Sequence, residues 1–186
     1  MVLANAVICD ITGVMSANNP YGEILPAVPN YQDPSVPVDE AYTWNVIPPT
    51  DEGGIVRVVF SSQLNAETKA ASPEKVALLA HYDEVAWGDA KGQEGFLYYR
   101  PDEVDETTLF ARSFCLWRRA TDAEAASQRD EHRRAVAYAM GPGRDVYATY
   151  DVRKDRLEQT DHGLIVTRLA RMTVRHGNVV DSWKVA

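Results

Sequence analysis

The sequence contains only two cysteines, Cys9 and Cys115, and no C-x-x-C pair. Two cysteines so far apart exclude the usual zinc patterns and a disulfide framework. Cys115 stands in an apolar, β-prone run, so we expect a small buried side chain there. Neither H-x-H nor H-E-x-x-H occurs, and the sequence therefore predicts no metal site.

Long apolar runs and the common nucleotide and nucleophile motifs are also missing. No stretch approaches the roughly 18 apolar residues that span a bilayer. The opening "MVLANAVICDITGVM" lacks a basic region and contains Asp10, so it does not match a secretory signal. The absence of G-x-G-x-x-G, P-loop and G-x-S-x-G patterns argues against nucleotide-dependent chemistry and triad hydrolysis. We expect a cytoplasmic protein without a membrane partner.

Positive charge is scarce as well. The 19 basic residues stand against 27 acidic ones, and the net charge is −8. This balance argues against a nucleic-acid partner, which needs a basic surface. Two short basic clusters, "RRATD" at 118–122 and "HRR" at 132–134, run against the overall sign. Clusters of this size most often form a solvated surface.

Prolines are concentrated in one place. Seven of them lie between Pro20 and Pro49, a density that forbids regular helix and interrupts strands. The same stretch carries Tyr31, Tyr42 and Trp44, which make it too apolar for a solvated linker. We therefore divide the chain into residues 1–54, an apolar first strand plus an irregular segment packed on the core, and residues 55–186, an α+β domain.

From Ile55 onward the pattern becomes regular. Ser72 and Pro73 mark the start of one helix, and Thr121 with Glu124 forms a capping box that marks the start of another, running to Met140. The predicted strands are 55–64, 94–101, 109–120 and 145–159, followed by a C-terminal hairpin that turns at residues 176–178.

This order, β-α-β-β-α-β, is the ferredoxin-like split βαβ arrangement. It predicts an antiparallel sheet with both helices on one face. The other face needs a cover, because one layer of helices cannot bury both sides of a sheet. A second subunit's sheet would supply that cover in a homodimer. The proline-rich segment (residues 20–49) and the C-terminal hairpin are the alternative.

"RSFCLW" (112–117), followed by a helix bearing "EHRRAV" (131–136), resembles the helical half of the dimeric α/β-barrel superfamily. That superfamily includes antibiotic-biosynthesis monooxygenases, EthD-like proteins and polyketide cyclases. Together with "FSSQL" and "GFLYYR", the run is also similar to a group of fungal and bacterial proteins, over residues 55–157. The resemblance implies a dimer with a barrel-like cavity and a monooxygenase or cyclase type of activity.

Histidines are the first candidate catalytic groups. His132 lies among small residues on the second helix, and a neutral imidazole facing the cavity is suited to abstracting a proton from an acidic carbon or a phenol. The alternative is an imidazole at the helix edge, bonded to a carboxylate. His81 lies one position away from the apolar stripe of the first helix, so it reaches the cavity only if that helix is rotated.

Tyrosines are the second group. Alternation along a strand sends Tyr98 and Tyr99 to opposite faces, and Tyr147 and Tyr150 likewise. One tyrosine from each strand would then line the same cavity, where its hydroxyl orients a phenol or carbonyl. Amphipathic packing with the hydroxyl at the rim is the commoner arrangement. We take Tyr98 or Tyr99, with Tyr150, as substrate-orienting candidates.

Three functions fit this inventory. The first is an enzyme that works without a bound cofactor on a small apolar, aromatic or polyketide-like substrate, by oxygenation, cyclisation or isomerisation after proton removal. The second is a non-catalytic ligand-binding or dimerisation module. The third is a haem protein with a helix histidine as axial ligand, which a Soret band on purified protein would reveal.

Overall fold

The computed structural model describes residues 19–50, 53–101, 104–141 and 145–185. Its centre is one six-stranded antiparallel sheet in the order β2-β3-β1-β4-β5-β6. The strands are β1 (Ile55–Leu64), β2 (Phe96–Arg100), β3 (Phe110–Trp117), β4 (Tyr147–Thr160), β5 (Gly163–Arg175) and β6 (Asn178–Lys184). The α-helices are α1 (Val38–Ala41), α2 (Ala66–Ala71), α3 (Pro73–Lys91), α4 (Ala120–Ser127) and α5 (Asp130–Met140), with 3₁₀ turns η2 (Pro20–Glu23) and η3 (Trp44–Val46).

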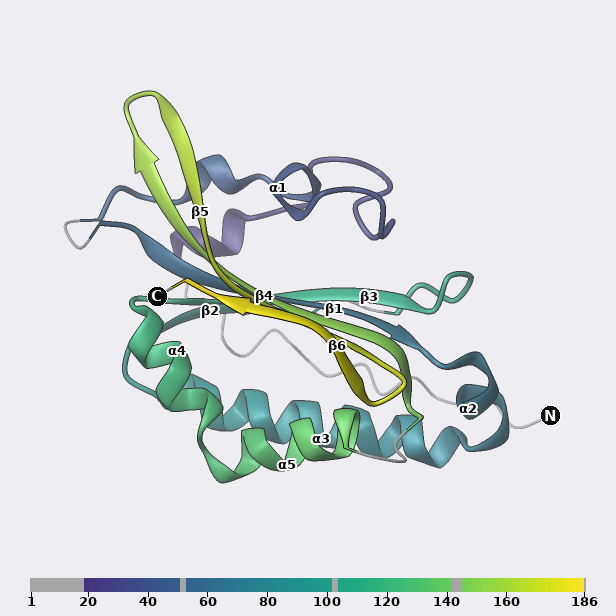
Figure 1. The fold of residues 1–186 in the computed structure, drawn as a ribbon. Helices are drawn as coiled ribbons and strands as arrows, with labels where there is room; N and C mark the ends of the chain where they lie inside the picture. The colour runs from purple at the N-terminus through teal and green to yellow at the C-terminus, as the bar shows by residue number, and fades with distance from the viewer. Residues whose placement is uncertain (1–18, 51–52, 102–103, 142–144, 186) are drawn as a thin grey trace.

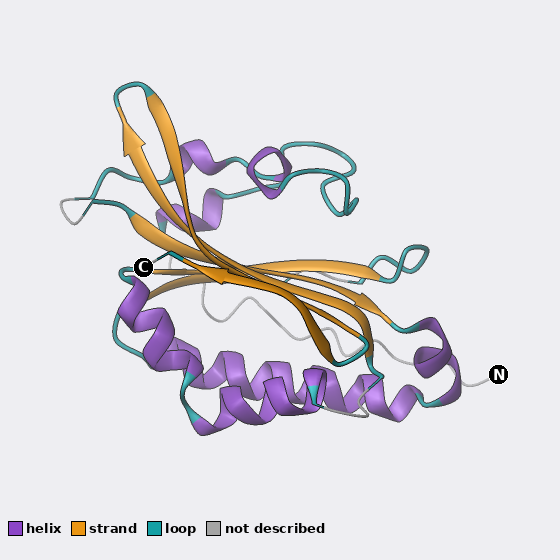
Figure 2. Cartoon of the chain, in the orientation of Figure 1, coloured by secondary structure: helices purple, strands orange, loops and turns teal. Residues whose placement is uncertain are grey.

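The first four strands have the ferredoxin-like order, which confirms the predicted fold class. Figure 1 shows α3, α4 and α5 on one face of the sheet, which we call the helical face. The described part of the proline-rich segment lies on the opposite face, which we call the segment face. The C-terminal hairpin of β5 and β6 mainly extends the sheet beyond β4 rather than covering it, because β5 pairs with β4 along most of its length (Figure 2). Of the two parts that formed the alternative cover, the proline-rich segment therefore lies over the sheet, whereas the hairpin mainly extends it (Figure 1).

The helix starts were predicted with mixed success. Helix α3 begins at Pro73 after Ser72, as predicted. The second predicted helix is divided in two, and its N-cap is Arg119 rather than Thr121. The division falls at Gln128 and Arg129, whose N–H groups donate to carbonyls three residues back and so end α4. Arg129 is extended and bonds Asp89 of α3, with Nη2 2.7 Å from Oδ1, so a tertiary ion pair accompanies the break.

The proline-rich segment packs through its aromatic side chains, as predicted. Tyr42 is 2% and Trp44 3% exposed, and both rings contact Phe114 of β3. Tyr31 meets the edge of Tyr42 at 5.6 Å between ring centroids. The irregular backbone bonds largely to itself, and the sheet supplies further donors: Arg112 Nη1 donates to the Tyr31 carbonyl at 2.9 Å. The predicted first strand, at residues 3–15, lies outside the described residues.

A buried ionic cluster ties this segment to the sheet. The side chains of Arg57 on β1 and Asp155 on β4 are both fully buried, with Arg57 Nε 3.2 Å from Asp155 Oδ2. Asp39 of α1 pairs with Arg57 and with Arg168 of β5. The indole of Trp44 covers the Arg57 guanidinium at 4.4 Å. Asp39 therefore joins the proline-rich segment electrostatically to strands β1, β4 and β5, through Arg57, Arg153 and Arg168.

Replacing Trp44 with phenylalanine should lower the free energy of unfolding by about 1–3 kcal/mol, because the Val38 carbonyl loses its donor. The Nε1–O distance of that hydrogen bond is 2.9 Å. Urea denaturation measures the change. Trp183→Phe is the matched control, since Trp183 on β6 is 40% exposed, and it should change stability little. Equal losses in the two variants would contradict the proposed packing.

Candidate functional site

An acidic side chain interrupts the apolar stripe with which α3 faces the sheet. Asp83 lies four residues after Leu79, which is 4% exposed, and four before Trp87. This spacing puts all three on one side of the helix. Desolvation by the surrounding helix and sheet raises the pKa of Asp83 to about 6, although the residue is exposed at the surface. A carboxyl with this pKa is ionised at neutral pH and takes up a proton under mildly acidic conditions.

Tyr147 and Tyr150 lie opposite Asp83 on the helical face. Their ring centroids are 5.2 Å apart, so the prediction that the two point to opposite faces is wrong. The cause is a register shift in the β1–β4 pairing, where Gln63 pairs with Thr149 but Leu64 pairs with Tyr147. The extra β4 residue turns Tyr147 back to the face of Tyr150.

Both phenols stay protonated at neutral pH. Burial raises the pKa of Tyr147, and the charge of Asp83 raises it further. Burial likewise raises the pKa of Tyr150, with added effects from Tyr147 and Asp83. The pair therefore offers hydroxyl donors beside a carboxylate, which is an arrangement suited to holding an oxygen while a nearby carbon or hydroxyl loses its proton.

Tyr98 and Tyr99 separate as predicted. Tyr98 lies on the segment face, with its ring centroid 6.1 Å from that of Phe114. Tyr99 lies on the helical face, 5.7 Å from the Trp87 ring. Tyr99 also contributes to the raised pKa of Tyr147. The structure thus brings Tyr99, and not Tyr98, into the layer that contains Tyr150.

His132 is at the start of α5, three residues before the buried Ala135, on the side that faces the sheet. Desolvation lowers the pKa of His132, the charge of Lys154 lowers it further, and Asp89 acts in the opposite direction. The imidazole is therefore neutral at pH 7. Lys154 lies four residues from Tyr150 on β4, roughly 13 Å along a strand. His132 therefore lies on the same face of the sheet as Tyr147 and Tyr150, but near Lys154, farther along β4.

His81 does not join this group. Its side chain is exposed on α3, and its ring centroid lies 6.1 Å from that of the neighbouring Tyr82. Tyr82 packs against Tyr138 of α5 at 5.0 Å, as the apolar stripe predicted. The helix is not rotated in the way that a role for His81 requires.

Sequence reasoning missed Asp83 and the shared face of Tyr147. The spacing of Asp83 from Leu79 and Trp87 was a usable signal, whereas the strand irregularity that turns Tyr147 left none. The Trp87 Nε1 atom is buried without a hydrogen-bond partner, next to Tyr99. Burial raises the pKa of the Cys115 thiol to about 12, which keeps it unreactive and confirms the predicted buried side chain.

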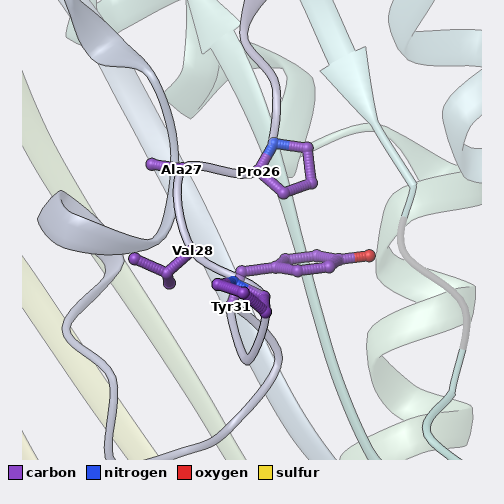
Figure 3. A pocket seen from close by; sticks show the side chains of 5 residues that line it. Pro26, Ala27, Val28 and Tyr31 are labelled. Carbon is purple, nitrogen blue, oxygen red and sulfur yellow. The ribbon is translucent and has the colours of Figure 1, made fainter.

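Among residues 19–50, 53–101, 104–141 and 145–185, no group of three or more His, Cys, Asp and Glu side chains is arranged to hold a metal ion. No helix in that part of the chain is both long and apolar enough to cross a bilayer. A shallow hollow of about 410 Å³ is lined by Pro26, Ala27, Val28, Pro29 and Tyr31 (Figure 3). Its lining carries no acid–base group other than the Tyr31 phenol.

A family model described as PB2B2.08-like matches residues 37–168. Among the curated proteins, none matches the sequence. A conserved protein of Methanosarcina mazei is similar in structure, with 14% identity and a TM-score of 0.45 over 56% of this chain and 94% of that one. A candidate antibiotic biosynthesis monooxygenase of Nitrosomonas europaea has 8% identity and a TM-score of 0.41 over 52% and 82%. An aldoxime dehydratase has 9% identity and a TM-score of 0.37 over 74% and 38%.

Proposed function

The chain belongs to the PB2B2.08-like family, and we propose that it is an enzyme that removes a proton from a small, largely apolar substrate held between α3 and the sheet. One observation carries the proposal: the Asp83 carboxyl, with its pKa raised to about 6, lies close enough to the paired phenols of Tyr147 and Tyr150 for its charge to raise the pKa of both. A general base works best with a pKa near the working pH.

Each neighbour has a role in this scheme. Asp83 accepts the proton from an acidic carbon or a phenol of the substrate. The hydroxyls of Tyr147 and Tyr150 donate to the oxygen on which negative charge develops, which stabilises an enolate or phenolate. Tyr99 and Trp87 supply aromatic contact, and the unpaired Trp87 Nε1 is one further donor. An aromatic or polyketide-like substrate has the acidic proton, the oxygen acceptor and the apolar surface that these groups would contact.

His132 is the second base in the proposal. Its neutral imidazole accepts a proton at pH 7, and Lys154 beside it disfavours the charged form. Oxygenation, cyclisation and isomerisation can all begin with the same proton removal, and none of the roles assigned here uses a bound cofactor. The enolate or phenolate is therefore the common intermediate of the proposed reaction class.

Deuterium uptake tests the proposal without knowledge of the product. Aromatic ketones and β-diketones are incubated in D₂O with the protein, and loss of the acidic C–H signal is followed by proton NMR. The wild-type protein should accelerate exchange of at least one compound over buffer. Asp83→Asn should lose most of that acceleration, and Glu74→Gln, an exposed carboxylate in the first turn of the same helix, should keep it.

The outcomes separate the candidate functions. Exchange that survives Asp83→Asn but is lost in His132→Ala would transfer the role of base to His132. Exchange at the wild-type rate in both variants would overturn the assignment. Binding of a compound, seen as line broadening, with no exchange in any variant would favour the ligand-binding module instead.

A further inference from the structure

A second hollow, of about 420 Å³, lies at the other end of the helical face. It is lined by Gly54, Val56, Arg118, Arg119, Ala120, Thr121 and Arg156. These residues come from the beginning of β1, the end of β3, the start of α4 and the middle of β4. None of them takes part in the proposed proton transfer, so an inference about this hollow stands apart from that function.

Three arginines surround the hollow in a chain whose net charge is −8. Arg118 and Arg156 are exposed, and neither side chain has an ion-pair partner among the described residues. Arg119, which has interactions of its own, adds a third positive charge. The nearby Asp122 carboxylate lies against Gly95 and does not line the hollow. The basic cluster of "RRATD" is thus gathered around a concave surface instead of being spread over a solvated one.

The backbone adds donors to the same place. Helix α4 has eight residues, and its N-cap residue Arg119 makes no side-chain hydrogen bond to the first turn. The first intrahelical bond runs from Ala123 N–H to the Arg119 carbonyl, which leaves the N–H groups of Ala120 and Thr121 without helical partners. Both residues line the hollow. Their N–H groups and the positive end of the helix dipole favour an anion there.

Gly54 keeps the floor of the hollow close to the sheet. It has a φ of +99°, and a Cβ at this position would lie 2.4 Å from the Leu157 carbonyl oxygen. A larger residue is therefore excluded on both grounds. Gly54 and Val56 line this part of the hollow, and Val56 pairs with Arg156 of the neighbouring strand β4.

We propose that this hollow binds an oxyanion, the phosphate or carboxylate group of a small ligand. Guanidinium groups recognise such groups with paired N–H donors, and the free N–H groups of a helix start complete the coordination. The volume of about 420 Å³ accommodates the anionic group and part of the molecule that carries it. An arginine that only forms a surface salt bridge needs neither a concave surface nor two further arginines beside it.

Titration calorimetry with inorganic phosphate, and separately with benzoate, tests the site on the whole protein. Arg156→Gln and Arg118→Gln remove one cation each, and Arg175→Gln removes an exposed cation on β5, away from the hollow. Phosphate or benzoate should bind to the wild-type protein, and each of the first two variants should weaken binding about tenfold, the effect of one charge-assisted hydrogen bond. Arg175→Gln should bind as the wild type does.

Ligand-dependent melting gives a second measurement, because a bound anion raises the melting temperature of the folded protein. Heat and a melting shift with phosphate alone would identify a phosphate site, and with benzoate alone a carboxylate site. Absence of both effects for both anions at millimolar concentration would overturn the proposal. An equal loss of affinity in all three variants would also overturn it, since it would show attraction by net charge only.

Discussion

Asp155→Ala should lower the free energy of unfolding by about 3–5 kcal/mol, the cost of leaving a buried charge without its partner. The Arg57 guanidinium is fully buried and bonds Asp155 through both Nε and Nη2. Asp155 also accepts a hydrogen bond from Arg153 Nε and forms an ion pair with Arg168, at 3.0 Å each. Removing one carboxylate therefore leaves three arginines around the single carboxylate of Asp39.

Equilibrium urea unfolding measures this change, and Asp151→Ala is the control on the same strand. Asp151 pairs with Arg171 nearer to solvent, and an exposed pair contributes only about 0–1 kcal/mol. The double variant Arg57→Met with Asp155→Leu should recover part of the loss, because an apolar pair can replace a buried ion pair. A loss under 1 kcal/mol in Asp155→Ala would show that water reaches Arg57 and that the segment packs more loosely on the sheet.

The secondary structure was largely predictable because it depends on local signals. The run from Ile55 to Leu64 is β-branched and became β1, and Pro73 after Ser72 fixed the start of α3. The break at Arg129 was not predictable, since it accompanies an ion pair with Asp89, 40 residues earlier in the chain. A capping box at Thr121 was a valid local preference that the tertiary arrangement overrode.

The candidate site was less predictable than the fold, for a physical reason. Strict alternation along β4 separates Tyr147 from Tyr150, and only the register against Leu64 brings them together. Tyr98 and Tyr99 were correctly separated, because β2 keeps its alternation at these two residues. Asp83 was not predicted as a site residue, although its position in the sequence carried a signal. A carboxylate between Leu79 and Trp87 contradicts the apolar stripe, and such a contradiction often marks a functional position.

Asp83→Asn should reduce the turnover of the proposed reaction by about 10²–10⁴, the usual contribution of a general base. The amide keeps the size of the side chain but cannot accept the proton. For the wild-type enzyme, kcat/KM should rise with pH through an apparent pKa of about 6, as Asp83 loses its proton. This rise should be absent in the variant, and the Glu74→Gln control should keep both the rate and the profile.

The same variant should be more stable than the wild type at pH 8. The folded-state pKa of Asp83 is raised above its unfolded value, so its contribution to stability is fully present below about pH 4 and is lost as pH rises through about 6. Asparagine, which never ionises, avoids that loss. After a discount for the solvent access of this side chain, we expect a gain of about 2–4 °C in melting temperature at pH 8. No gain is expected at pH 4. A variant that loses turnover and gains stability only at pH 8 would identify Asp83 as a base that is retained although it lowers the stability of the fold. Lost turnover with lowered stability at both pH values would instead mean that the carboxylate stabilises the packing of α3 on the sheet.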